Sequence, residues 1–222
     1  MGAGTNAIKI RGVEHLHGTS YSIIPDQIEA GTYMVAAAAT KGDILIENVI
    51  PKHLESIIAK IIEIGATVTE YDESVRVTMK TRPKKCTIKT MPHPGFPTDM
   101  QPQFGVLLSI ADGTSFITEG VWESRYRYLE QLAIMGADFK VDGKTAMITG
   151  VESLKPAPVK AVDLRAGAAV IIAGLMTKGE TTVEQIQFID RGYEHIAEKF
   201  TKLGADIKRV TVNDNAANTK MA

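Results

Sequence analysis

The stretch Ile64-Gly65-Ala66-Thr67-Val68 decides the fold, because the chain contains it three times in related form. The other copies are Met135-Gly136-Ala137-Asp138-Phe139 and Leu203-Gly204-Ala205-Asp206-Ile207, so the glycine recurs after 71 and then 68 residues. A glycine at this point tolerates the left-handed conformation that ends many helices. A period of this length predicts an internal repeat of three structural units.

The residues before each of these glycines have the pattern of an amphipathic helix. Four columns are apolar in all three copies: Ile57/Tyr128/Ile196, Ile58/Leu129/Ala197, Ile61/Leu132/Phe200 and Ile64/Met135/Leu203. This spacing lines one face of an α-helix. An alternating segment follows each glycine and predicts a strand.

A second glycine recurs inside each unit, at Gly42, Gly113 and Gly179. Each follows a run with almost no polar face: residues 34–39, 105–110 and 166–176. A helix that is apolar all round is buried on all sides. Each unit therefore reads strand, buried helix, strand, amphipathic helix, strand, strand. Hairpins are expected across Tyr71 to Ser74 in the first unit and across Asp142-Gly143 in the second.

We expect one α/β domain over residues 1–222, with units at about 14–80, 86–150 and 157–212. The third unit lacks the outer strand of its hairpin, and residues 213–222 read as a flexible tail. The chain opens with a spare strand, Ile8 to Val13. This strand is expected to fold back beside Asp206 to Val212 and close the third unit, since an unpaired edge invites aggregation. The competing expectation is pairing with another copy of the chain.

Composition excludes several classes of protein. Lys and Arg number 25 against 26 Asp and Glu, which gives no support to nucleic-acid binding. One cysteine excludes an internal disulfide framework and indicates a cytoplasmic protein. The start of the chain shows no signal peptide, and the longest apolar run is too short to span a bilayer. We expect neither a nucleic-acid nor a membrane partner.

Three short motifs have better ordinary explanations than functional ones. The glycine-rich residues 2–7 precede a strand, whereas a dinucleotide loop must follow one. His15 and His17 lack a third metal ligand at helpful spacing, so we expect a surface loop. Cys86 follows Lys84 and Lys85, which could lower its pKa. No histidine or acid motif accompanies it, and we interpret it as a plain strand cysteine.

The polar residues near the starts of the helices are the candidates for chemistry. Asp26 and Asp163 open two of the buried helices, but Asp99 falls two positions later in register, so it is either a cap or a functional carboxylate. Arg165 and Arg191 each occupy the first turn of a predicted helix. They make either local pairs with the preceding aspartates or an anion site. Arg125 is a third candidate for the anion site, or a surface charge on its helix.

Four motifs together resemble the UDP-N-acetylglucosamine 1-carboxyvinyltransferases of the enolpyruvyl transferase family. They are Ile24-Pro25-Asp26-Gln27-Ile28-Glu29-Ala30-Gly31-Thr32, residues 96–101, Asp163-Leu164-Arg165-Ala166 and Ile189-Asp190-Arg191-Gly192-Tyr193-Glu194. The resemblance runs from about Gly4 to Val210. It implies an inside-out α/β barrel of three βαβαββ repeats, with buried helices inside and sheets outside.

The resemblance implies a role for each candidate. Asp99 matches the carboxylate that contacts the sugar 3-hydroxyl and is proposed as its general base, and Val121 matches a position whose backbone touches the UDP-sugar. Arg165 and Arg191 match arginines near phosphoenolpyruvate, and Arg125 matches another cleft arginine. Asp99 and Arg191 are the expected catalytic residues. Where the family pattern has Thr, Phe and Asn, this chain has Gly120, Trp122 and Ser124, which puts details of sugar contact in doubt.

The family's enzyme is about twice this length, and this chain resembles its C-terminal half. The reactive cysteine belongs to the other half, and Cys86 does not match it. The resemblance implies transfer of enolpyruvyl from phosphoenolpyruvate to UDP-N-acetylglucosamine for peptidoglycan synthesis, with no metal or organic cofactor. The partners implied are the two substrates and the missing N-terminal domain, without which we expect no activity. Two alternatives stay open: a non-catalytic module that binds a UDP-sugar or pairs with another half, and a sibling transferase acting on shikimate phosphate.

Overall fold

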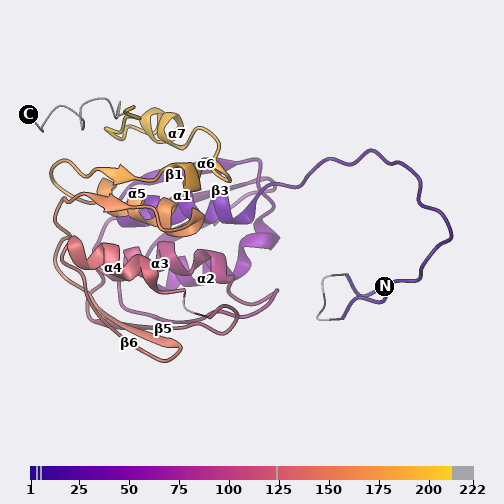
Figure 1. The fold of residues 1–222 in the computed structure, drawn as a ribbon, viewed down its shortest axis with the longest axis horizontal. Coiled ribbons are helices and arrows are strands. Elements are labelled where there is room, and N and C mark those ends of the chain that lie inside the picture. The colour runs from indigo at the N-terminus through magenta and orange to yellow at the C-terminus, as the bar shows by residue number, and fades with distance from the viewer. Residues whose placement is uncertain (4, 6, 124, 212–222) are drawn as a thin grey trace, which may run out of the picture.

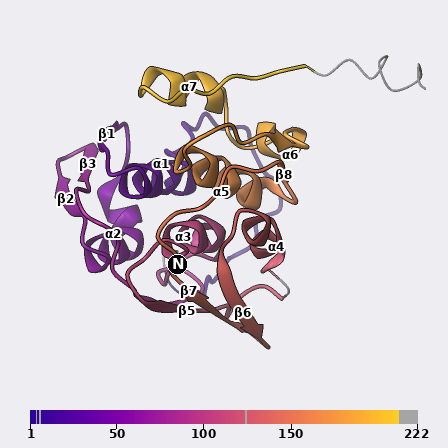
Figure 2. The same cartoon turned by 90° about the vertical axis from the view of Figure 1, so that its left-hand side faces the viewer.

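Three helices form the centre of the molecule. The computed structural model describes residues 1–3, 5, 7–123 and 125–211, and the central helices are α1 (Gln27–Ala39), α3 (Gln101–Leu108) and α5 (Leu164–Leu175). They lie side by side in both ribbon views (Figures 1 and 2). All of α3 is buried, and so is nearly all of α1. This confirms that the apolar runs form buried helices.

Two of the central helices begin at the expected caps. The Asp26 carboxylate accepts a hydrogen bond from the Ile28 N–H at 2.7 Å, and the Asp163 carboxylate accepts one from the Ala166 N–H at 2.8 Å. These bonds satisfy backbone donors that have no partner inside the helix. The third helix begins differently, because the short 3₁₀ helix η2 (Thr98–Met100) leads into α3 without a side-chain cap.

The amphipathic helices are α2 (Glu55–Glu63), preceded by the 3₁₀ helix η1 (Pro51–Leu54), α4 (Arg127–Ile134) and α7 (Ile196–Lys202). The first two bury all four of their predicted apolar positions, whereas α7 buries Ile196 and Phe200 but leaves Leu203 49% exposed. The glycines that follow have φ values of 103°, 88° and 95°, at Gly65, Gly136 and Gly204 respectively. The left-handed backbone that the repeated phrase predicts is therefore confirmed in all three copies.

Two antiparallel hairpins cover the outside of the first two units. In one sheet the strands β1 (Asp43–Glu47), β2 (Thr67–Glu70) and β3 (Ser74–Thr78) are ordered β1-β3-β2. The other sheet contains β4 (Thr87–Lys89), β5 (Thr114–Thr118), β6 (Asp138–Asp142) and β7 (Thr145–Thr149), ordered β4-β5-β7-β6. Alternate residues of β3, β5 and β7 face the core, so both predicted hairpins and the α/β class are confirmed.

The third unit departs from the prediction. Its two-residue strands β8 (Val159–Lys160) and β9 (Val183–Glu184) pair in parallel, and the short helix α6 (Gln187–Asp190) precedes α7. The expected strand beginning at Asp206 is not formed in residues 206–211. Ala205 and Ile207 pack against the core, but no neighbouring strand supplies hydrogen-bond partners for a ladder. Val212 and the expected tail, 213–222, lie outside the described residues.

The expectation that Ile8 to Val13 closes the third unit is wrong. These residues form no strand, and Ile8, Ile10 and Val13 are 65%, 84% and 70% exposed. The N-terminal segment leaves the body as an arm on the side away from the C-terminal end of the described chain (Figure 1). It carries His15 and His17 as exposed residues, and no strand precedes α1 within the described part of the chain.

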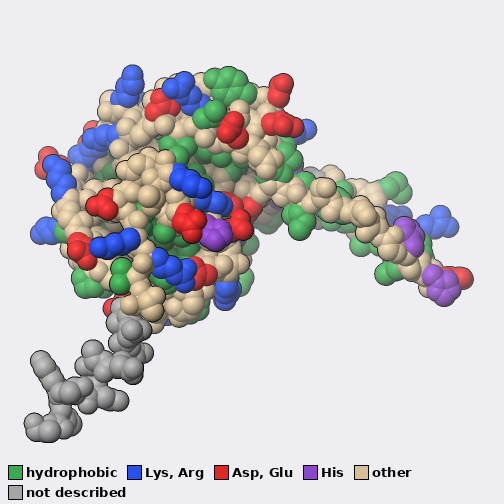
Figure 3. Space-filling view, turned by 90° about the horizontal axis from the view of Figure 1, so that it is seen from above, with side chains coloured by type: hydrophobic (Ala, Val, Ile, Leu, Met, Phe, Trp, Pro, Cys, Tyr) green, Lys and Arg blue, Asp and Glu red, His purple; other side chains and the backbone are tan. Residues whose placement is uncertain are grey.

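The surface carries both charges. Figure 3 shows acidic and basic side chains interspersed on the face that α7 covers, with the N-terminal arm projecting from the body. Among the described residues, no helix is long and apolar enough to cross a membrane.

Candidate functional site

Asp99 is a partner of two arginines and does not cap a helix. Its Oδ1 lies 2.9 Å from Nη2 of Arg125, and its Oδ2 accepts a hydrogen bond from Nε of Arg165 at 3.1 Å. The Asp99 side chain is 38% exposed, whereas the side chains of Arg125 and Arg165 are 13% and 14% exposed. The displaced register of Asp99 therefore aims its carboxylate away from the backbone of α3 and toward the arginines.

Arg165 reaches Asp99 from the first turn of α5. Asp163 accepts from the Ala166 N–H, so the expected local pair between Asp163 and Arg165 is not formed. The Arg165 guanidinium lies 5.4 Å from the centre of the Tyr193 ring. Burial alone would lower the pKa of Arg165, but Tyr193 and Asp99 outweigh it, and the pKa is raised. Arg165 is thus a permanent cation held between an aromatic ring and a carboxylate.

Tyr193 is itself fixed by a buried polar group of side chains. Its hydroxyl is 2.9 Å from Oγ1 of Thr32 and accepts from Nε2 of Gln103 at 3.3 Å. The three residues come from α1, α3 and the loop after α6. Burial is the main cause that raises the pKa of Tyr193. No motif in the sequence indicated this group, because its members are far apart along the chain.

Arg125 joins Asp99 to the loop after β5. Its guanidinium lies 5.9 Å from the centre of the Trp122 ring, and its Nη1 donates to Oγ1 of Thr98 in a long contact of 3.5 Å. Trp122 is 63% exposed, and Val121 is 46% exposed beside it. Ser124, another departure from the family pattern, lies outside the described residues.

Glu119 is a buried carboxylate that the sequence did not single out as functional. It lies at the end of β5 and is 2% exposed. It accepts hydrogen bonds from the hydroxyls of Thr90 and Thr98 and from the N–H groups of Val121 and Trp122. The only signal in the sequence was an acid at the end of an apolar strand, which is too common to indicate a site.

Arg191 is placed differently from the expectation. It does not lie in the first turn of a helix, because α6 ends at Asp190 and Arg191 caps its C-terminal end. Asp190 pairs with Arg209 at 2.8 Å and not with Arg191. Arg191 is exposed and makes no ion pair within residues 1–3, 5, 7–123 and 125–211. The structure therefore brings together Asp99, Arg125 and Arg165, but not Arg191.

The two arginines and one aspartate leave a net positive charge next to a carboxylate that is 38% exposed. Guanidinium groups suit the bidentate binding of phosphate or carboxylate, and an accessible carboxylate can accept a proton from a hydroxyl. The arrangement can therefore bind an anion beside a potential general base. We name Asp99, Arg125 and Arg165 the Asp99 cluster.

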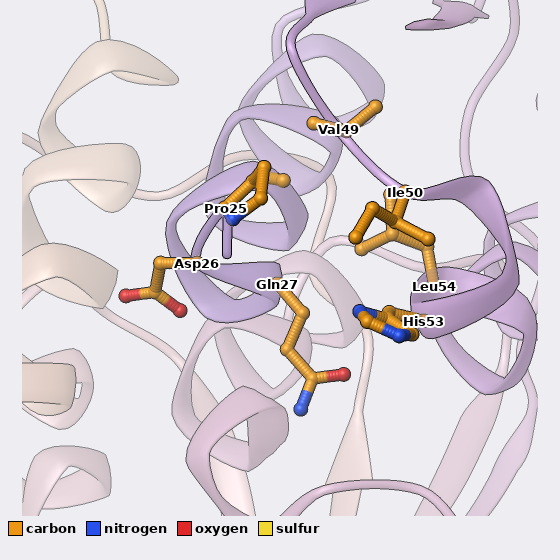
Figure 4. A pocket seen from close by; sticks show the side chains of 8 residues that line it. Pro25, Asp26, Gln27, Val49, Ile50, His53 and Leu54 are labelled. Atoms are coloured by element: carbon orange, nitrogen blue, oxygen red, sulfur yellow. The ribbon is translucent and has the colours of Figure 1, made fainter. Parts of the chain in front are cut away.

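Two other places offer no comparable chemistry. A hollow between the start of α1 and η1 is lined by Pro25, Gln27, His53 and their neighbours (Figure 4), and it has no free space for a water molecule. Its Asp26 is already engaged as a helix cap. Cys86 is buried, which raises the pKa of its thiol to about 12. A thiol that stays protonated at neutral pH is a poor nucleophile, which agrees with the interpretation of Cys86 as a cysteine without a catalytic role.

Comparison with protein families finds one matching model. Residues 2–200 match the family model described as EPSP synthase (3-phosphoshikimate 1-carboxyvinyltransferase). Among solved structures, the enolpyruvyl transferase NikO from Streptomyces tendae is 26% identical with a TM-score of 0.76, over 86% of this chain and 46% of that one. EPSP synthase from Acinetobacter baumannii is 22% identical with a TM-score of 0.70, over 85% and 48%, which shows a shared fold.

Curated relatives are more similar in sequence. The UDP-N-acetylglucosamine 1-carboxyvinyltransferase 3 of Caldanaerobacter subterraneus is 58% identical over 94% of this chain and 50% of its own length. The UDP-N-acetylglucosamine 1-carboxyvinyltransferase of Clostridium botulinum is 54% identical over 94% and 50%. The protein of that name from Desulfofundulus thermocisternus is 52% identical over 96% and 88%. The chain spans about half the length of the first two relatives.

Proposed function

Since the chain belongs to the EPSP synthase (3-phosphoshikimate 1-carboxyvinyltransferase) family, we propose that it is half of an enolpyruvyl transferase that uses UDP-N-acetylglucosamine. The carrying observation is the likeness to UDP-N-acetylglucosamine 1-carboxyvinyltransferases along almost the whole chain. The Asp99 cluster supports the proposal, because it sets a carboxylate beside two cations. The product feeds peptidoglycan synthesis, and the enzyme works in the cytoplasm.

The reaction joins the sugar 3-hydroxyl to carbon 2 of phosphoenolpyruvate and releases phosphate. Asp99 accepts the hydroxyl proton as the oxygen attacks, while carbon 3 takes a proton from an acid on the N-terminal half to form a tetrahedral intermediate. Loss of phosphate, with return of a proton from carbon 3 to that group, restores the double bond. Arg165 of the Asp99 cluster and Arg191, which lies exposed outside it, neutralise the phosphate and carboxylate charges. Arg125 is a further arginine of the cleft, and the Val121 backbone contacts the UDP-sugar. No cofactor takes part.

The fold of the complete domain is part of the proposal. Residues 1–222 belong to a single inside-out α/β barrel whose three units end near residues 80, 150 and 212. The central placement of α1, α3 and α5 supports this arrangement, since the two sheets lie outside them (Figure 2). The N-terminal half supplies the opposite wall of the cleft and the reactive cysteine.

The test is phosphate release with both substrates. We expect none from residues 1–222 alone, because the reacting groups must be held from both walls of the cleft. Adding the separately produced N-terminal half should restore release. Turnover by the chain alone would contradict the need for the second half.

The same assay separates the alternatives. UDP-sugar binding without turnover, even with the other half present, would favour a non-catalytic module. Phosphate release with shikimate phosphate in place of the UDP-sugar would favour the sibling transferase.

A further inference from the structure

Glu119 stands out because it is buried and yet contacts neither Asp99 nor the arginines in the Asp99 cluster. Its Oε1 accepts from Oγ1 of Thr90 at 2.5 Å, from the Val121 N–H at 2.9 Å and from the Trp122 N–H at 3.0 Å. Its Oε2 accepts from Oγ1 of Thr98 at 2.9 Å. Four donors thus converge on a carboxylate that is 2% exposed.

The four donors come from separate parts of the chain. Thr90 follows β4, Thr98 begins η2 immediately before Asp99, and Val121 and Trp122 form the loop after β5. The Thr90 hydroxyl also accepts from the Gly120 N–H at 2.8 Å. The carboxylate is therefore the only described group that hydrogen-bonds both the Thr98 end of η2 and the Val121–Trp122 loop.

Thr98 connects this carboxylate to the Asp99 cluster. Its hydroxyl donates to Glu119 and accepts from Nη1 of Arg125 at 3.5 Å, while Nη2 of Arg125 lies 2.9 Å from Asp99. The order of contacts is Glu119, Thr98, Arg125, Asp99. The buried end of this network is Glu119, whose two oxygens are both engaged, and a satisfied buried group fixes the geometry of the segments that it holds.

We infer that Glu119 is a positioning residue, which holds Asp99 and Arg125 in register with the Val121–Trp122 loop. It acts through Thr98 and through two backbone N–H groups and does not touch the substrates. Because both N–H groups are engaged by Glu119, the loop can offer a ligand only its carbonyls and the exposed side chains. The consequence for catalysis rests on the proposed function, whereas the coupling between the two segments does not.

The coupling is tested in the chain of residues 1–222 itself. Thr98→Val removes the hydroxyl with little change of shape, and Thr98→Ser restores it. Thr177→Val is the matched control, because Thr177 is also half-buried and its hydroxyl bonds only the Gly174 carbonyl and Thr181, beyond the C-terminal end of α5. The readouts are amide resonances and hydrogen exchange of Val121 and Trp122, together with fluorescence of Trp122, the one tryptophan of the chain.

We expect Thr98→Val to shift both amide resonances, to change the Trp122 emission and to speed exchange of the two amides by about threefold or more, because a loosened carboxylate holds them less well. Thr98→Ser should return the wild-type values, and Thr177→Val should leave the Val121–Trp122 loop unchanged. Glu119→Ala should shift the amides of Asp99 and Met100 in turn. If Glu119→Ala fails to fold, the Thr98 variants still test the coupling between η2 and the Val121–Trp122 loop. An unchanged loop in Thr98→Val would overturn the inference.

The catalytic consequence is tested with the N-terminal half added. Thr98→Val should lower kcat for phosphate release by about tenfold or more, the scale of one lost positioning bond, with KM for the UDP-sugar little changed. Wild-type turnover in this variant would show that Glu119 does not position the catalytic groups. Absence of phosphate release by the wild-type pair would instead contradict the proposed function, and the loop measurements would then decide the coupling alone.

Discussion

At the scale of single residues, Asp99→Asn distinguishes a catalytic role of Asp99 from a purely structural one. Asp99→Asn keeps the size of the side chain but cannot accept a proton at neutral pH. With the N-terminal half present, we expect turnover to fall by about 100-fold or more, the usual scale for a lost general base. Steady-state phosphate release measures this.

Stability should change little in the same variant. The Asp99 carboxylate is 38% exposed, and the asparagine amide keeps an oxygen that can accept hydrogen bonds from the two arginines, so we expect a loss of about 1 kcal/mol. Asp43→Asn is the matched control, since Asp43 pairs with Arg76 on an exposed strand far from the site. Near-normal turnover in Asp99→Asn, or an equal loss in Asp43→Asn, would contradict the proposed role of Asp99.

Cys86 gives a pH dependence of stability. Burial, followed by the nearby Glu63, raises the pKa of the thiol to about 12. A thiol whose pKa is higher in the folded than in the unfolded state stabilises the fold fully below the unfolded pKa, and this contribution is lost as the pH rises toward 12.

We expect the free energy of unfolding of the wild type to fall between pH 9.5 and 11 more steeply than that of Cys86→Ala, by about 1 kcal/mol per pH unit. Urea unfolding at several pH values measures the two slopes. The cavity that the alanine leaves lowers the free energy of unfolding equally at every pH, so it does not affect the comparison of slopes. Parallel slopes would show that the thiol titrates alike in both states.

At the scale of elements, the packing of α3 against α4 depends on Gly105. A methyl group there would overlap the ring and hydroxyl of Tyr128, a rigid side chain that is 1% exposed. Gly31 in α1 also faces a neighbour, but a methyl group there meets the flexible end of Met100, with Sδ at 2.8 Å. An added methyl group would therefore require a rigid tyrosine ring to shift at Gly105, but only a flexible methionine side chain at Gly31.

We expect Gly105→Ala to destabilise the protein by about 3 kcal/mol and Gly31→Ala by about 1 kcal/mol or less. Overpacking against a buried ring exceeds the better helix propensity of alanine, whereas a methionine side chain can adjust. Denaturant unfolding of both variants measures the difference. Equal effects would mean that Tyr128 can move after all.

At the scale of the whole molecule, Arg82 ties the segment between the first two units to two separate parts of the second. Its guanidinium donates to the carbonyls of Ile110, Ala111, Gly150 and Val151 at 2.9 to 3.3 Å. The first two carbonyls follow α3, and the other two follow β7, while Arg82 itself lies between β3 and β4. Lysine cannot reproduce this, because its donors do not form a planar fork.

We expect Arg82→Lys to destabilise the protein by about 2 kcal/mol, since buried carbonyls would lose their partners. Arg76→Lys is the control at an exposed ion pair, with an expected change of about 0.5 kcal/mol or less. Chemical unfolding followed by circular dichroism gives both values. A loss in Arg82→Lys no larger than in the control would show that water replaces the lost donors.

Local patterns in the sequence determined the parts of this protein that depend on neighbouring residues. The glycines after α2, α4 and α7 need a left-handed backbone whatever surrounds them, so their recurrence predicted the repeat. Apolar runs without a polar face predicted α1, α3 and α5, because only burial can satisfy such a surface. Asp26 and Asp163 cap helices through bonds to the next few residues, which spacing alone can predict.

Only the tertiary structure decided the contacts between residues far apart in the chain. Asp99 and Arg165 are 66 positions apart, and they became partners because η2 packs on α1 and α3, which in turn pack against α5. Glu119 accepts hydrogen bonds from Thr90, from Thr98 and from the Val121–Trp122 loop because these three segments meet at the end of β5. The missing closure of the third unit has the same origin. Ile8 to Val13 alternates as a strand should, but a strand forms only where another backbone offers its hydrogen bonds.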